Sequence, residues 1–246
     1  MNRATAAARR LMWRLRPPVM ALGGGGARGF AHLGVLEVLE EAGLGVRAIA
    51  GTSMGAVVGA MVLASGSASN SIARWREAID EGKVPSVRNF KALPDADRHE
   101  HPLLQVARRI RNRLVVSFAM NRETMLDDKD LTRAFDFLLP DIDVADLGRP
   151  FVAVATDAET GEEIRLSRGP LRAVLKASSA IPGLLPATPL EGRMLLDGGV
   201  VAEVPVAAAR SLGRPVVAVD VSIELGPLRP DDLVLDTMMQ IGRAHV

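Results

Sequence analysis

Residues 46–63 read VRAIAGTSMGAVVGAMVL, which is an apolar run, a short turn and a second apolar run of helical length. The turn, Gly51-Thr52-Ser53-Met54-Gly55, fits the pattern Gly-x-Ser-x-Gly, in which a serine sits on a sharp strand-to-helix connection with its hydroxyl exposed. Gly51 and Gly55 leave room where neighbouring backbone passes close to the strained serine. The pattern alone is common, but its strand–turn–helix context favours a nucleophilic Ser53 over a tight turn with an unreactive serine.

A serine hydroxyl is a poor nucleophile at neutral pH, so a base has to take its proton. None of the histidines has a convincing claim to that role. In α/β-hydrolases the catalytic triad follows the chain order Ser, then Asp or Glu, then His. Only His245 lies far enough downstream of Ser53 for this order, and it stands one residue from the end of the chain. We expect His32 to be packed or solvated. His99 and His101 are two residues apart and would not share a helix face, which disfavours a metal pair.

Asp197 is the better candidate for the base. It follows an apolar run at 194–196 and precedes Gly198 and Gly199, so we expect its carboxylate at the carboxyl end of a strand. Reactive groups gather at that end of the strands in open parallel sheets. A carboxylate within hydrogen-bond reach of a serine can act as general base if its surroundings raise its pKa. The alternative is an ordinary Asp-Gly turn.

A glycine-rich loop precedes the serine elbow, between an expected strand at 19–22 and an expected helix at 28–42. Backbone N–H groups in such a loop lack partners and can point at one spot. We therefore expect an oxyanion hole in this loop, with Gly25 and Gly26 as the best donors. Arg28 either adds positive charge toward an anionic head group or is solvated. The loop residues assigned to the oxyanion hole are Gly24, Gly25, Gly26, Ala27, Arg28 and Gly29.

The same loop also fits Gly-x-Gly-x-x-Gly through Gly24, Gly26 and Gly29, which makes a dinucleotide-binding, Rossmann-like protein the alternative. Glu40 and Glu41 follow the loop, but they end the helix, whereas the acidic residue of that motif ends a second strand. Here the second strand leads into the serine elbow. A catalytically inactive lipid-binding scaffold is a third interpretation.

The glycine loop with its arginine, the serine elbow and Asp197-Gly198-Gly199, in this order, resemble the patatin-like phospholipase family, particularly its bacterial members. The resemblance extends to PFVAVATD at 150–157, ASSAIPG at 177–183 and the segment 204–221, and it is weak between 83 and 130. It implies a patatin-like fold, Ser53 as nucleophile, Asp197 as base, the glycine loop as oxyanion hole, and hydrolysis of lipid acyl esters. Many relatives carry Asn after the Asp-Gly-Gly motif, where this chain has Ala202-Glu203.

The composition predicts one α/β domain over 19–240. Alternating strand-like and helix-like runs predict three layers, with a mostly parallel central sheet and helices on both faces. The chain has 246 residues of which 48% are hydrophobic, enough for a full core, and no cysteine, which excludes disulfides and is compatible with a cytoplasmic location. A net charge of +1 and an aromatic content of 3% disfavour a nucleic-acid partner. Elbow, oxyanion loop and aspartate complete an acyl-transfer set, so we expect no cofactor and no metal.

Positive charge is local. The basic extension at 1–18 has five arginines and no acid beside Leu11, Met12, Trp13 and Leu15, so it is either a peripheral membrane contact or a frayed start. A second basic cluster at 108–113 lies in the variable, cap-like region 83–130, where it faces either phospholipid or solvent. The last residues, IGRAHV at 241–246, resemble a translated sequencing adapter, and we interpret them as a non-native tail behind which the natural C-terminal region is missing.

Overall fold

The computed structural model describes residues 11–83 and 128–222. His99, His101, His245, the basic cluster at 108–113, most of the cap-like region and the tail at 241–246 lie outside these ranges.

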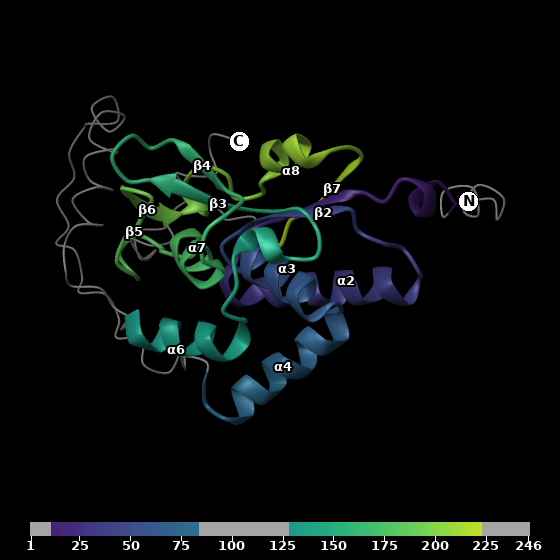
Figure 1. The fold of residues 1–246 in the computed structure, drawn as a ribbon, viewed down its shortest axis with the longest axis horizontal. Coiled ribbons are helices and arrows are strands. Elements are labelled where there is room, and N and C mark those ends of the chain that lie inside the picture. The colour runs from purple at the N-terminus through teal and green to yellow at the C-terminus, as the bar shows by residue number, and fades with distance from the viewer. Residues whose placement is uncertain (1–10, 84–127, 223–246) are drawn as a thin grey trace, which may run out of the picture.

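One mixed sheet of seven strands forms the centre of the molecule, in the order β5-β6-β3-β2-β1-β7 with β4 paired to β3 (Figure 1). β1, β2, β3 and β7 are parallel, β4 and β6 run antiparallel to β3, and β5 runs antiparallel to β6, so five of the seven strands share one direction. The expected mostly parallel sheet is therefore confirmed, with an antiparallel part at one side. The strands are β1 (Val19–Leu22), β2 (Ala48–Thr52), β3 (Phe151–Asp157), β4 (Glu163–Leu166), β5 (Thr188–Leu190), β6 (Arg193–Asp197) and β7 (Val216–Val219).

Helices cover both faces of the sheet, but unequally. In Figure 1, α8 lies on one face and the other labelled helices lie on the opposite face. The helices are α2 (Ala31–Glu41), α3 (Met54–Ser65), α4 (Ala68–Asp80), α6 (Asp128–Leu138), α7 (Leu171–Ser178) and α8 (Val206–Leu212), with short 3-10 turns η1 (Gly26–Phe30), η3 (Val144–Asp146) and η4 (Gly198–Val200). No single helix in the described ranges has the length and apolarity to cross a membrane; α3 and α4 reach them only as a pair, bent by 114° at their break.

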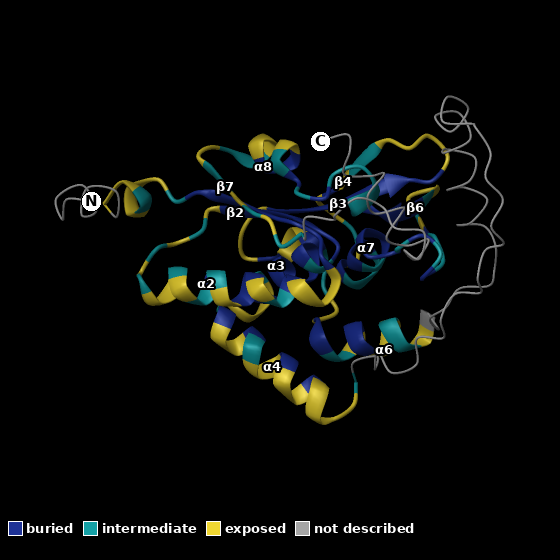
Figure 2. Ribbon diagram, turned by 180° about the vertical axis from the view of Figure 1, so that it is seen from behind, coloured by how far each residue is buried: buried dark blue, intermediate teal, exposed yellow. Residues whose placement is uncertain are grey.

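Side chains of the parallel strands alternate between two cores, as the pleat requires. Met20 and Leu22 of β1 belong to the large core beneath the sheet, whereas Val19 and Ala21 pack with Ala208 and its neighbours from α8. All four strand positions are fully buried, which explains why the strand is a continuous apolar run in the sequence. Figure 2 shows the buried sheet between the more exposed outer faces of α2, α4 and α8.

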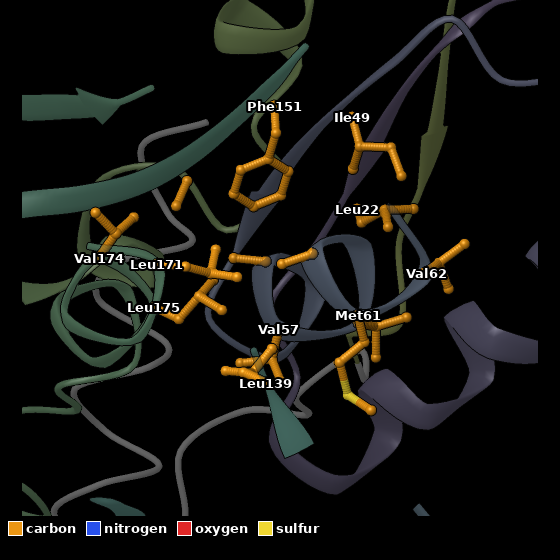
Figure 3. Packing of buried hydrophobic residues seen from close by; sticks show 14 of the residues in the cluster. Leu22, Ile49, Val57, Met61, Val62, Leu139, Phe151, Leu171, Val174 and Leu175 are labelled. Carbon is orange, nitrogen blue, oxygen red and sulfur yellow. The ribbon is translucent and has the colours of Figure 1, made fainter. Parts of the chain in front are cut away.

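Helix α3 is the central element of the large core. Every residue from Gly55 to Val62 is buried, so the helix is apolar on all sides rather than amphipathic. Figure 3 shows Val57 beside Leu139, and Met61 and Val62 on the side of α3 away from the α7 residues. At the start of the helix, a Cβ on Gly55 would overlap the backbone carbonyl groups of Leu22 and Gly23, so the helix touches the end of β1 directly.

Replacement of Gly55 by alanine should destabilise the protein by about 3 kcal/mol or more, because the overlapping atoms are backbone and cannot rotate away. Gly34 of α2 is the matched control, since a Cβ there meets no heavy atom within 4 Å. Gly34→Ala should stabilise by up to about 1 kcal/mol through helix propensity. Urea denaturation measures both. Equal effects of the two substitutions would contradict the close approach of α3 to β1.

Candidate active site

Strand β3 brings the two ends of the site together. Val154 pairs with Thr52 of β2, and the next residue, Ala155, pairs with Asp197 of β6. Because β4 pairs with both of these β3 residues from one edge, β2 and β6 share the other edge. β2 runs parallel to β3 and β6 antiparallel, so their carboxyl ends point toward each other. Asp197 was expected at the carboxyl end of a strand and lies there; this strand runs antiparallel to β3, and its end-to-end placement with β2 along β3 brings Asp197 to the serine.

Ser53 occupies the sharp turn between β2 and α3. Its φ of 52° and ψ of −124° place a non-glycine residue in a strained, left-handed region. Its carbonyl accepts hydrogen bonds from Ala56 and Val57 in the first turn of α3, at 2.9 and 3.1 Å. A Cβ on Gly51 would overlap the backbone of Ala56, so the turn needs a glycine there. The hydrogen bonds to α3 and the missing side chain at Gly51 thus fix the strained conformation of Ser53.

Ser53 and Asp197 form a buried hydrogen-bonded pair. The Ser53 Oγ donates to Asp197 Oδ2 at 2.6 Å, and Asp197 Oδ1 accepts from the Gly199 N–H at 2.6 Å. Burial, with a smaller contribution from the charge of Glu203, raises the pKa of Asp197 to about 6, against the lowering effect of these two hydrogen bonds. A Cβ on Gly198 would overlap the carbonyl of Val154, so the aspartate loop lies directly against β3.

The glycine loop lies beside the nucleophile. A Cβ on Gly24 would come within 3.6 Å of the Ser53 Cβ, and one on Gly29 would overlap the Met54 side chain. The Gly24 N–H donates to the carbonyl of Glu203 at 2.8 Å, so it is already bonded. Within the described residues, the N–H groups of Gly25 and Gly26 have no hydrogen-bond partner. Gly25 and Gly26, the best of the expected oxyanion donors, are therefore available.

Two other residues of this region have structural partners. Arg28 is exposed, and its Nε donates to the carbonyl of Val221 at 2.9 Å, which fastens the loop to the end of β7. His32 is fully buried with its Nε2 at 2.8 Å from the carbonyl of Gly23. Because a carbonyl only accepts, the Nε2 carries the proton; burial lowers the pKa of His32, so the ring is neutral. His32 is packed under the loop, and it forms a hydrogen bond with neither Ser53 nor Asp197.

Sequence reasoning missed the residues that support the pair. The Ser178 Oγ accepts from the Ser53 N–H at 3.0 Å and donates to the Val154 carbonyl at 2.6 Å, so it ties the elbow to β3. The Thr52 Oγ1 donates to the carbonyl of Ala202 at 2.8 Å. The Gly24 N–H likewise donates to the carbonyl of Glu203. Ala202 and Glu203 therefore support the aspartate loop through their backbone carbonyls, which cannot be recognised from the residue types.

A family model described as patatin-like phospholipase matches residues 20–210, the range that holds the glycine loop, the elbow and Asp197. The chain belongs to the patatin-like phospholipase family. An uncharacterised NTE family protein of Mycobacterium tuberculosis is 34% identical over 212 residues, which are 85% of this chain and 51% of that protein. Patatin-like phospholipase domain-containing protein 6 of Homo sapiens is 34% identical over 206 residues, 82% of this chain and 13% of that protein.

The chain thus spans about half the length of its mycobacterial relatives and a smaller part of the human one. Among solved structures, VipD from Legionella pneumophila is similar with a TM-score of 0.44 and 18% sequence identity, over 74% of this chain and 45% of that one.

The Ser178→Ala substitution should destabilise the protein by about 1–3 kcal/mol, because it leaves the Ser53 N–H and the Val154 carbonyl buried without their partner. The neighbouring Ser179 is the control: it is also buried, and its Oγ has no hydrogen-bond partner among the described residues. Ser179→Ala should therefore change the free energy of unfolding little. Denaturant titrations in which both substitutions cost the same would refute the supporting role of Ser178.

Proposed function

We propose that the protein is a serine hydrolase of lipid acyl esters, in which Ser53 and Asp197 form a catalytic dyad and the glycine loop forms the oxyanion hole. The 2.6 Å hydrogen bond between the Ser53 Oγ and Asp197 Oδ2 is the observation that carries the proposal. It joins a strained, elbow-type serine to a carboxylate whose pKa is raised to about 6. Such a carboxylate is largely ionised at neutral pH and is a stronger base than an ordinary aspartate.

The dyad would act in two halves. In the first, Asp197 takes the hydroxyl proton as the Ser53 Oγ attacks the ester carbonyl carbon. The oxyanion of the tetrahedral intermediate is held by the N–H groups of Gly25 and Gly26. The intermediate collapses, the C–O bond to the alcohol breaks, and Asp197 returns the proton to the leaving oxygen. In the second half, Asp197 takes a proton from water as the water oxygen attacks the acyl carbon. The bond from that carbon to the Ser53 Oγ then breaks, Asp197 returns the proton to the Oγ, and the acyl chain leaves as a carboxylic acid.

We propose phospholipids or lysophospholipids as the substrate class, ahead of neutral acylglycerols. Arg28 supports this assignment because it is exposed on the same short loop as Gly25 and Gly26. Its Nε is bonded to the carbonyl of Val221, which holds the guanidinium in place; its other donors have no hydrogen-bond partner in the part of the chain that the structure describes and could bind a phosphate. The family to which the chain belongs is consistent with this class.

The position of Glu40 does not support the alternative of dinucleotide binding. Glu40 accepts two hydrogen bonds from the N–H of Ala68, at 2.8 and 2.9 Å, and so supports the start of α4. It is not at the end of a second strand, where a ribose-binding acid would lie. The second strand, β2, ends at Thr52 and leads into the elbow.

Ser53→Ala should abolish covalent labelling by a fluorophosphonate and hydrolysis in a mass-spectrometric screen of phospholipids, lysophospholipids and acylglycerols with the same acyl chain. Asp197→Asn should lower the rate by a factor on the order of 10²–10⁴, because the volume is kept and the base is lost. His32→Gln is the control, since glutamine can still donate to the Gly23 carbonyl. Inactive His32→Gln together with active Asp197→Asn would disprove the dyad. Vesicle binding without labelling would instead indicate an inactive scaffold.

The activity should rise with pH and level off above about 6, because Asp197 accepts a proton only when ionised and its pKa is raised to about 6. Glu203→Gln removes a negative charge that raises this pKa, so the rising limb of kcat/KM should move to lower pH. Glu162→Gln, an exposed position on the turn before β4, is the control and should leave the profile in place. A soluble short-chain ester serves as substrate. An upward or absent shift in Glu203→Gln would contradict the electrostatic coupling.

A further inference from the structure

Three arginines surround one hollow at the amino-terminal edge of the sheet. Arg47 immediately precedes β2, Arg214 lies two residues before β7, and Arg16 lies three residues before β1. These three strands are adjacent and parallel, so the residues before them meet at one edge. Together with Leu15 and Pro17, the arginines line a hollow of about 400 Å³. In Figure 1, this edge lies at the right, beside the turn of helix that leads into β1.

Acidic side chains in the part of the chain that the structure describes do not neutralise the arginines of this edge. Among the described residues, no ion pair involves Arg16, Arg47 or Arg214. Two more arginines extend the positive charge: Arg14 packs against Gly43, and the Arg149 side chain donates to the carbonyl of Val46. Five positive charges at one edge repel one another, and an anion that binds between them offsets this repulsion. The edge is therefore complementary to a negatively charged surface.

Exposed apolar side chains border the arginines. Residues 11–15 form a turn of helix, on which Leu11, Met12 and Leu15 are 59%, 65% and 72% exposed. Trp13 points to the opposite side, toward the body of the protein, and its Nε1 donates to the carbonyl of Gly45 at 3.2 Å. This bond orients the turn so that its apolar arc faces outward. An apolar arc beside basic side chains is the pattern of segments that lie in a membrane interface.

We propose that this edge is a docking surface for a membrane that contains anionic phospholipids. Arg16, Arg47 and Arg214 bind a lipid phosphate in the hollow, and the apolar arc at 11–15 inserts beside the acyl chains. A free phosphate would use the arginines but not the apolar arc, and this difference favours a lipid. The surface lies at the amino ends of the strands, whereas Ser53 lies at the carboxyl end of β2, so the docked head group is not an ester at the dyad. The inference does not rest on the proposed hydrolase activity.

Sedimentation of the full chain with vesicles tests the proposal. Wild type should bind phosphatidylcholine vesicles that contain phosphatidylglycerol more tightly than vesicles of phosphatidylcholine alone, and added salt should weaken this binding. The triple variant Arg16→Gln, Arg47→Gln, Arg214→Gln should lose about a hundredfold in partition coefficient, about fivefold for each arginine near an anionic surface. The control is a second triple variant, Arg76→Gln, Arg168→Gln, Arg210→Gln. It removes the same charge from exposed positions on α4, after β4 and on α8, and it should bind as wild type.

The apolar arc is tested by Leu15→Ser, which should weaken binding to the same vesicles while the three arginines remain. Equal losses in the two triple variants, or equal binding of anionic and neutral vesicles by wild type, would overturn the proposal. Thermal stabilisation by inorganic phosphate that disappears in the first triple variant, without vesicle binding, would show a free-phosphate site instead. Ser53→Ala should bind vesicles as wild type, and the first triple variant should still hydrolyse a soluble ester, so this proposal and the hydrolase proposal fail separately.

Discussion

The division of one edge of β3 between β2 and β6 is the constraint on which the site depends. Thr52 and Asp197 pair with consecutive β3 residues, so backbone hydrogen bonds set the distance from the serine to its carboxylate. A slip of two residues in either pairing would move the ends apart by about 7 Å. A hydrogen bond tolerates a few tenths of an ångström. The pair therefore requires the sheet register, and the side chains of Ser178 and Thr52 secure that register across β3 and the aspartate loop.

Close backbone contacts follow from the same arrangement. No space is left for a side chain at Gly51 against the start of α3, at Gly55 against the end of β1, or at Gly198 against β3. Ser53 itself takes a positive φ, at a cost of order 1–3 kcal/mol. The hydrogen bonds that its carbonyl accepts from the first turn of the buried helix α3 offset part of that cost. The backbone strain at Ser53 and the close packing of the glycines around it both follow from the sharp turn between β2 and α3.

The sequence was sufficient for what depends on local pattern: the apolar strands, the elbow with its glycines, the loop before α2 and the Asp-Gly-Gly turn. It was insufficient where partners are distant or are backbone atoms. Ser178 lies 125 residues from Ser53 and looks like any small polar residue at the end of a helix. The carbonyls of Ala202 and Glu203 could not be predicted as acceptors, since every residue has one. The antiparallel direction of β6 could not be predicted, because an apolar run that ends in aspartate looks the same in either orientation.

The electrostatics of Asp197 explain how a hydrolase could work here without histidine. An ordinary aspartate, with a pKa of about 3.9, is a weak base toward a serine hydroxyl, whereas a histidine with a pKa of about 6.5 is the usual choice. Burial and the charge of Glu203 raise the pKa of Asp197 to about 6, although two hydrogen bonds stabilise its charged form and act in the opposite direction. The aspartate thus has nearly the basicity of an imidazole, with one fewer residue to position. His32, the histidine nearest to Ser53 in sequence, donates to the carbonyl of Gly23 instead.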